Sequence, residues 1–381
     1  MRLTLSRSPG GTRWVTVTGM SEVLRVRGVV LPAGEHREFW VADGTIIDEA
    51  HPDARDLTAG LGTCWILPGL VDAHCHVGLD ANGAVDEATQ EVQARTDRDA
   101  GALLLRDCGS AADTRWIDAR EDLPQILRAG RHVARTKRYI RNFGHEVEPD
   151  QLATYIAAEA RRGDGWVKFV GDWIDRDAGD LTPCWPAEAV REAVAAAHAA
   201  GARVTSHVFG EQALPDLIAA GIDCIEHGTG LSTELVDEMA LKRVALVPTV
   251  TNLENFPRFA QAGEEKFPRY AQHMRDLHAR RRDTIGAAYE AGVQIYAGTD
   301  AGGQLPHGLI ATEVEGLLSY GLSAFDAVGA ASWRAREWLG VDGSLSAGAR
   351  ADFCVYAADP IRDVRVLAAP QRIVLRGRVI G

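Results

Sequence analysis

The segment GLVDAHCHVGLD, residues 69–80, ends an apolar run with two histidines that are separated by one residue. Residues 69–73 are typical of a buried strand. Strand side chains alternate between faces, so we expect His74 and His76 to point to the same side. Cys75 then points to the opposite face and packs in the core. Two imidazoles on one face at the end of a core strand indicate either a metal site or two polar side chains at the core boundary, and further ligands must come from elsewhere in the chain.

The composition is that of a globular protein with an acidic surface. Hydrophobic residues make up 46% of the 381 residues, charged residues make up 25%, and the net charge is −12. This charge argues against nucleic acid or anionic lipid as a partner, and no apolar run is long enough to span a membrane. The cysteines are scattered without CxxC spacing, and the N-terminal residues contain no apolar stretch typical of a secretion signal. We expect a cytoplasmic homo-oligomer that acts on a small molecule.

A repeated Ala-Gly pair organises the middle of the chain. Each pair follows a helix-like segment and precedes an apolar strand-like segment, and the glycines are Gly101, Gly130, Gly201, Gly221 and Gly292. Glycine just beyond a helix supplies the left-handed turn that ends it. Helices that alternate with strands in this way predict a parallel sheet.

Eight strand-like segments fall between residues 67 and 342. They are residues 70–76, 102–108, 132–140, 165–171, 202–209, 222–228, 244–250 and 293–300. Eight βα units over this length predict a (β/α)8 TIM barrel. An open doubly wound sheet is the alternative, and the even spacing and the absence of a GxGxxG motif favour the barrel. Residues 1–66 and 343–381 contain short alternating strands instead, and we expect them to form one small β-sandwich domain built from both chain ends.

Three further polar side chains fall at the predicted strand ends. His207 lies six residues after Gly201, and His227 lies six residues after Gly221, so both imidazoles are expected at similar heights on neighbouring strands. Asp300 ends the eighth strand. Because active sites of TIM barrels lie at the carboxyl ends of the strands, four histidines and one carboxylate are expected to converge, and this set suits Zn²⁺ or a similar ion.

Lys168 lies inside the apolar strand segment GWVKFVG, in a chain with only four lysines. Burial of a lysine is costly and favours its neutral, nucleophilic amine. Such an amine can take up CO₂ and form a carbamate, whose two oxygens can bridge two cations. The alternative interpretation is a lysine paired with an acidic neighbour.

These residues and motifs resemble the amidohydrolase superfamily over nearly the whole chain. ILPGLVDAHCH is similar to its first-strand signature, and LLLRDCGS, GIDCIEHGTG and GTDAGG are similar to its prolidase and imidazolonepropionase-like branch. The resemblance implies a binuclear metal centre. One ion is held by His74, His76 and Asp300, the other by His207 and His227, and carboxylated Lys168 bridges the two. Two departures concern the substrate rather than the metals: Phe209 replaces a second His or Tyr, and ASWRAREWLG replaces a Thr- and Asn-containing helix start.

The resemblance implies hydrolysis of an amide or related C–N bond. Two divalent ions, expected to be Zn²⁺, activate a bridging hydroxide, and Asp300 serves as general acid and base. Substrates of this kind include a dipeptide or an N-acyl amino acid. The alternatives are a cyclic amide, carbamate or urea hydrolase with the same metals, a mononuclear deaminase, or a non-catalytic barrel scaffold.

The substrate contacts are expected in two segments. The basic stretch TKRYIRNFGHE contains Lys137, Arg138, Tyr139, Arg141 and His145, and these side chains either hold a substrate carboxylate or form a solvated loop. The insertion at residues 250–275 forms either a lid over the pocket or an oligomer contact.

Overall fold

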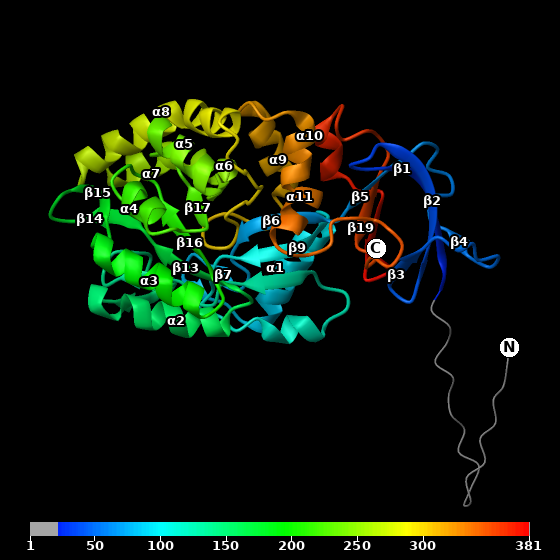
Figure 1. Ribbon diagram of the computed structural model, residues 1–381, viewed down its shortest axis with the longest axis horizontal. Helices are drawn as coiled ribbons and strands as arrows, with labels where there is room; N and C mark the ends of the chain where they lie inside the picture. The colour runs from blue at the N-terminus through cyan, green and yellow to red at the C-terminus, as the bar shows by residue number, and fades with distance from the viewer. Residues whose placement is uncertain (1–21, 381) are drawn as a thin grey trace, which may run out of the picture.

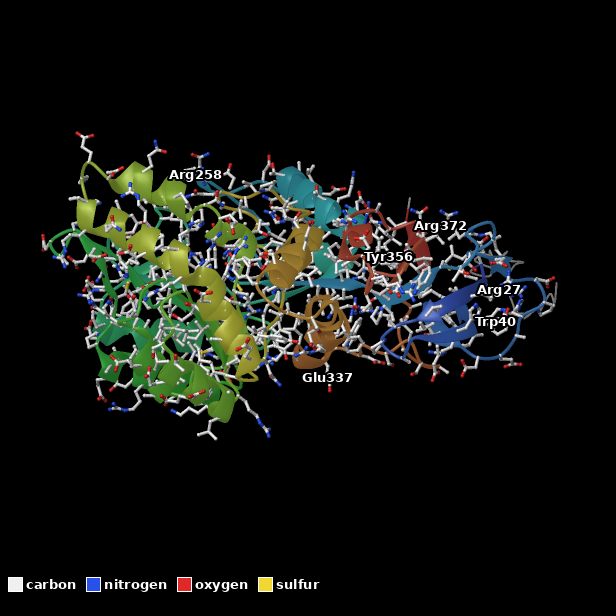
Figure 2. All side chains as sticks on the ribbon, turned by 90° about the horizontal axis from the view of Figure 1, so that it is seen from above. Arg27, Trp40, Arg258, Glu337, Tyr356 and Arg372 are labelled. Carbon is white, nitrogen blue, oxygen red and sulfur yellow. The ribbon has the colours of Figure 1, made fainter. Side chains whose placement is uncertain are left out.

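The computed structural model describes residues 22–380, which form two parts (Figure 1). One part contains parallel strands surrounded by helices. The other is a sheet built from both ends of the chain, and it lies at the opposite end of the molecule from the helical pair α7–α8. Figure 2 shows the same separation, with Arg27 and Trp40 on the terminal sheet and Arg258 at the far end on α7. No helix within residues 22–380 is both long and apolar enough to cross a membrane.

The parallel strands form two hydrogen-bonded sheets. The first contains β6 (Leu70–Cys75), β9 (Ala102–Asp107) and β10 (Gln125–Arg128). The second contains β11 (Val133–Arg135), β12 (His145–Val147), β13 (Trp166–Val170), β16 (Arg203–Val208), β17 (Cys224–His227) and β18 (Ala245–Val247). Every neighbouring pair in both sheets is parallel. The prediction of parallel strands is therefore confirmed.

The expected eighth strand is replaced by an irregular segment. Residues 294–301 contact both sheets through single bridges, Leu246 to Ile295 and Cys75 to Ala301, rather than through a continuous ladder. The two sheets also remain separate ladders between β10 and β11, so the strands are not closed by hydrogen bonds into one barrel.

The third strand of the parallel region begins earlier in the chain than the predicted residues 132–140. The chain enters the sheet earlier, at β10, and Ala129-Gly130 interrupts an extended segment instead of ending a helix. Gly130 has a φ of 70°, and a Cβ atom at this position would lie 2.6 Å from the Glu159 carboxylate, so only glycine fits there. Elsewhere the pattern holds: Gly101 (φ 89°) follows α1 and Gly201 (φ 80°) follows α3.

Helices cover the outside of the parallel strands. They are α1 (Glu87–Asp99), α2 (Leu152–Arg162), α3 (Ala187–Ala199), α4 (Leu214–Ala219), α5 (Thr233–Lys242), α6 (Val250–Leu253), α7 (Phe256–Gly263), α8 (Pro268–Glu290), α9 (Ile310–Ser319), α10 (Ala324–Ala330) and α11 (Trp333–Trp338). Two short hairpins, β7 (Leu79–Asp80) with β8 (Gly83–Ala84) and β14 (Asp172–Asp175) with β15 (Asp180–Pro183), extend from the strand ends.

The two chain ends pair in one mixed sheet. Its members are β1 (Leu24–Val30), β2 (Glu35–Ala42), β3 (Thr45–Ile47), β4 (Arg55–Asp56), β5 (Trp65–Pro68), β19 (Phe353–Tyr356), β20 (Arg372–Leu375) and β21 (Arg378–Ile380). Because β5 pairs with both β1 and β19, the N- and C-terminal strands join one ladder. The pairing of the two ends is as expected, whereas the two packed sheets of a sandwich are not confirmed. Residues 1–21 of the predicted domain lie outside the described residues.

Candidate active site

The predicted metal ligands converge at the carboxyl ends of the parallel strands. His74 lies in β6, with His76 one residue beyond that strand, and Lys168, His207 and His227 lie in β13, β16 and β17. Asp300 lies at the end of the irregular segment, where its backbone N–H donates to the His74 carbonyl at 2.7 Å. All four histidines and Lys168 are buried.

A first cluster joins His74, His76 and Asp300. The Asp300 Oδ1 atom lies 3.1 Å from His74 Nε2 and 3.3 Å from His76 Nε2, and the two Nε2 atoms are 3.3 Å apart. One ligand atom from each residue lies within 4.8 Å of the others. Two imidazole nitrogens and a carboxylate oxygen are a donor set that a borderline divalent ion such as Zn²⁺ accepts. These residues therefore fit a metal ion.

A second pair joins His207 and His227. His207 Nδ1 lies 3.0 Å from His227 Nε2, and burial lowers the pKa of His227 to about 3 and that of His207 well below its usual value. Two neutral imidazoles in contact leave a nitrogen lone pair available for a cation. Lys168 lies next to the first cluster, with its Nζ atom 2.9 Å from His74 Nε2.

The other ring nitrogen of each first-cluster histidine is held by an acceptor. His74 Nδ1 lies 2.7 Å from Glu226 Oε2, and His76 Nδ1 lies 2.7 Å from the Gly109 carbonyl. Both acceptors favour the tautomer that carries the proton on Nδ1, which leaves Nε2 free to bind a metal.

Two site residues adopt a backbone conformation that non-glycine residues rarely take. His227 has a φ of 69° and Asp300 a φ of 59°. Such strain persists where surrounding contacts impose it, and it is frequent at functional sites. Asn252 donates from Nδ2 to Asp300 Oδ2 at 2.7 Å. Burial alone would raise the pKa of Asp300, but His74 and His76 beside it hold that pKa well below its usual value.

Sequence reasoning missed a charged pair beneath the histidines. Glu226 is fully buried and accepts from Arg106 Nη2 at 2.6 Å and from the Thr205 hydroxyl. Arg106 lies with its guanidinium 4.5 Å from the Trp166 ring and 4.9 Å from the Trp338 ring. Arg106 lies in the motif LLLRDCGS and Glu226 lies in the motif GIDCIEHGTG. A charged residue within an apolar strand segment is the sequence signal that could have identified each of them.

A second group of possible ligand atoms, from His74, Cys108 and Glu226, fits a metal less well. The Glu226 oxygens already accept from other side chains, and burial raises the pKa of the Cys108 thiol well above its usual value. A thiol that stays protonated is a poor ligand.

A cavity of about 360 Å³ opens above the histidines. It is bounded by the loop after β11, the β14–β15 hairpin, α7, the start of α8 and the segment after Asp300. Its lining includes seven aromatic rings, those of Tyr139, Phe143, Trp173, Phe209, Phe259, Phe267 and Tyr270. The insertion at residues 250–275 therefore forms part of the cavity wall.

Of the five side chains of the basic stretch that were expected to contact the substrate, the structure brings only Tyr139 to the cavity, and Lys137 is not among the lining residues. Arg141 is exposed and is not among the lining residues. His145 is turned to α2, where its Nε2 atom lies 3.0 Å from Glu159. Arg138 donates to the carbonyls of Trp173 and Pro183, so its guanidinium supports the β14–β15 hairpin instead of facing the cavity.

The arrangement defines a class of site: buried histidines and a carboxylate, which fit a metal ion, at the carboxyl ends of parallel strands. Residues 65–380 match the profile of the amidohydrolase family, so the chain belongs to this family. It is therefore a hydrolase that acts on carbon–nitrogen bonds, in a family that generally uses divalent metals.

Several known proteins are similar to this chain over most of its length. An uncharacterized protein of Mycobacterium tuberculosis is 54% identical over 359 residues, which cover 94% of this chain and 96% of that protein. The crystal structure of a Xaa-Pro dipeptidase with bound methionine superposes with a TM-score of 0.79 at 22% identity, over 94% of this chain and all of that one. A prolidase complexed with N-methylphosphonate-L-proline gives a TM-score of 0.76 at 20% identity, over 94% and 99% of the two chains. At these identities the two solved structures establish a shared fold.

Proposed function

We propose that this protein is a binuclear metal-dependent amidohydrolase that cleaves an amide bond of a small molecule such as a dipeptide or an N-acyl amino acid. The observation that carries the proposal is the position of Lys168, whose Nζ atom lies 2.9 Å from His74 Nε2 in a buried cluster of possible ligands. An unmodified ammonium beside ligand nitrogens would repel a cation, whereas a carbamate would bind one.

The proposed carbamate forms from Lys168 and CO₂. The Nζ lone pair makes a bond to the carbon of CO₂, one C=O electron pair moves to an oxygen, and one Nζ proton leaves to solvent. The resulting anion offers two oxygens. His74, His76 and Asp300 would hold one divalent ion, His207 and His227 would hold the other, and the Lys168 carbamate would bridge them. We propose Zn²⁺ because imidazole nitrogen dominates the ligand set.

When bound, two divalent ions lower the pKa of a water and polarise the carbonyl of the substrate. Asp300 is held as an anion and oriented by Asn252, so its carboxylate can accept a proton and pass it to the leaving amine. Glu226 and the Gly109 carbonyl keep the histidine rings in place during this step.

A cyclic amide, carbamate or urea is the second candidate substrate. One observation favours it: no arginine of residues 22–380 lines the cavity, so the predicted cationic clamp for a substrate carboxylate is not assembled there. Neutral substrates of this kind need no such clamp.

We infer that residues 67–342 form a (β/α)8 barrel domain whose hydrogen-bonded ladder is open between β10 and β11 and irregular at residues 294–301, and that residues 1–66 and 343–381 form a separate β domain. We further propose a cytoplasmic homo-oligomer. The six cysteines are free and buried, in keeping with a reducing compartment.

A panel of substrates tests the proposed function. Dipeptides, N-acyl amino acids, cyclic amides and aryl carbamates are incubated with the purified enzyme, and the released amine is measured by mass spectrometry. Amine release that a chelator abolishes and Zn²⁺ restores supports the proposal. An enzyme that contains two ions per chain but releases no amine from any class would contradict it.

A further inference from the structure

We propose that the substrate group held in the cavity is bulky, uncharged and either aromatic or branched aliphatic. This inference rests on the proposed function and narrows its substrate class. It depends on the aromatic wall of the cavity, which lies next to the proposed metal ligands. The sequence patterns indicated only two parts of this wall, Tyr139 and the insertion at residues 250–275.

The aromatic side chains of the wall come from distant segments and contact one another. The Tyr139 and Trp173 rings lie 4.8 Å apart at 69°, and the Trp173 ring lies 5.3 Å from that of His207. Phe209 contacts Phe256 of α7 at 4.7 Å. Offset and edge-to-face contacts of this kind stabilise aromatic clusters, and a substrate ring entering the cavity would extend them. A cavity of about 360 Å³ has room for one such group.

The few charges on the cavity wall disfavour a charged group on the part of the substrate that lies among the aromatic rings. Two cations line the cavity among the described residues: Lys168, which lies within the proposed metal site, and Lys266, which is exposed at the turn between α7 and α8. The Lys266 Nζ atom lies 5.2 Å from the Phe267 ring, above the apolar wall. A carboxylate or ammonium placed among the inner rings would lose its hydration without gaining an oppositely charged side chain from the wall, which is strongly unfavourable.

The wall has a defined shape because the segment that closes it is tied to its neighbours. The Tyr270 backbone N–H donates to the Gly179 carbonyl at 3.1 Å, and Arg258 donates to Gln304 Oε1 at 2.8 Å. His273 of α8 lies between Asp180 and Glu211, 2.9 Å from each carboxylate. These contacts fix α7 and the start of α8 against the β14–β15 hairpin and the segment after Asp300.

Hydroxamic acids test this inference without requiring turnover. Acetohydroxamate, phenylacetohydroxamate and para-carboxyphenylacetohydroxamate share one metal-binding head group and differ only in the attached group. Their dissociation constants for the zinc-loaded enzyme are measured by titration calorimetry. We expect phenylacetohydroxamate to bind at least about tenfold more tightly than acetohydroxamate, and the para-carboxyl compound to lose most of this gain.

Two variants assign the effect to the wall. Phe259→Ala is expected to weaken phenylacetohydroxamate binding by about three- to tenfold and to leave acetohydroxamate binding unchanged. Phe325→Ala, which removes a partly exposed ring on α10 outside the cavity, is the matched control and is expected to change neither constant.

The outcomes separate the two proposals. If no hydroxamate binds and the protein holds no metal, the proposed function fails. If all three bind equally, or if the para-carboxyl compound binds most tightly, the metal site stands and the apolar substrate class is wrong. Tightest binding of the para-carboxyl compound would indicate that Lys266 binds a carboxylate of the substrate.

Discussion

Replacement of Glu226 by glutamine tests how the buried charges support the candidate site. Glu226 is fully buried and lies between Arg106 and His74, at 2.6 and 2.7 Å. The neutral amide leaves the Arg106 guanidinium buried without a counter-charge, which typically costs about 3–5 kcal/mol. The Trp166 and Trp338 rings beside Arg106 offset about 1 kcal/mol of this cost. We therefore expect Glu226→Gln to lower the free energy of unfolding of the metal-free protein by about 3 kcal/mol.

The same change affects the metal site through His74. Without the carboxylate, His74 Nδ1 loses a charged acceptor and Nε2 becomes a weaker ligand, so Zn²⁺ affinity should fall by about 10- to 100-fold. Urea unfolding of the metal-free protein measures the first effect, and a competitive chelator titration measures the second. The double variant Arg106→Met, Glu226→Gln should regain stability but not affinity, because it removes the unpaired charge without restoring the acceptor.

Glu238→Gln is the matched control for this prediction. Glu238 pairs with Lys242 on the surface of α5 at 2.7 Å, and an exposed pair of this spacing contributes less than about 0.5 kcal/mol. If Glu226→Gln were as stable as Glu238→Gln and bound Zn²⁺ with unchanged affinity, the supporting role of the buried pair would be refuted.

Three further predictions follow from other parts of the molecule. Hydrogen bonds from His273 to Glu211 and Asp180 raise the pKa of His273 to about 9 from 6.5. The stability that protonated His273 contributes is complete below pH 6.5 and is lost as the pH rises through 9, so the melting temperature of the protein should fall over this range. A fall of equal size in His273→Gln would show that His273 is not its origin. Arg141→Ala should change KM less than twofold because Arg141 does not line the cavity, whereas Tyr139→Ala should raise KM several-fold. The reverse order would place the substrate against Arg141, outside the cavity. Removal of bound metal by a chelator should abolish amine release and leave far-UV circular dichroism unchanged, since the site residues belong to a packed core; unfolding on metal removal would instead indicate a structural ion.

The sequence predicted the parallel strands and the convergence of the site residues for one physical reason. Buried strands in a parallel sheet are continuous apolar runs, so a histidine, lysine or aspartate within or at the end of such a run stands out. His74, Lys168 and His207 were found in this way. Asp300 was found at the end of a segment that lacks a regular ladder, because its polar residue still follows an apolar run.

The contacts between distant segments could not be read from local patterns. Arg106 and Glu226 are 120 positions apart, so the sequence around each residue does not reveal that they pair. The stacking of Arg106 on Trp166 likewise cannot be predicted from the sequence around either residue. The basic stretch after β11 was expected to face the substrate, yet Arg138 and His145 find partners in the protein itself. The sequence indicates that a buried charged side chain must be paired, but its partner depends on the three-dimensional fold.

In the terminal domain as well, the local sequence pattern predicted the strands but not the way in which they pack. Alternating strands at both chain ends predicted that the ends combine, and they do. Whether such strands form one sheet or two packed sheets depends on strand order, and this order is set by β5, which lies between β1 and β19.

The metal and CO₂ content of the site around Lys168 tests most directly whether a carbamate on this lysine holds two divalent ions. Intact-protein mass spectrometry under native conditions and metal analysis are applied to the wild type, to Lys168→Ala and to the control Lys242→Ala. We expect two divalent ions per chain and a mass gain equal to one CO₂ in the wild type and the control, and loss of the CO₂ and of at least one ion in Lys168→Ala. Two ions retained in Lys168→Ala, or a wild-type lysine that carries no CO₂ while both ions are bound, would contradict this expectation.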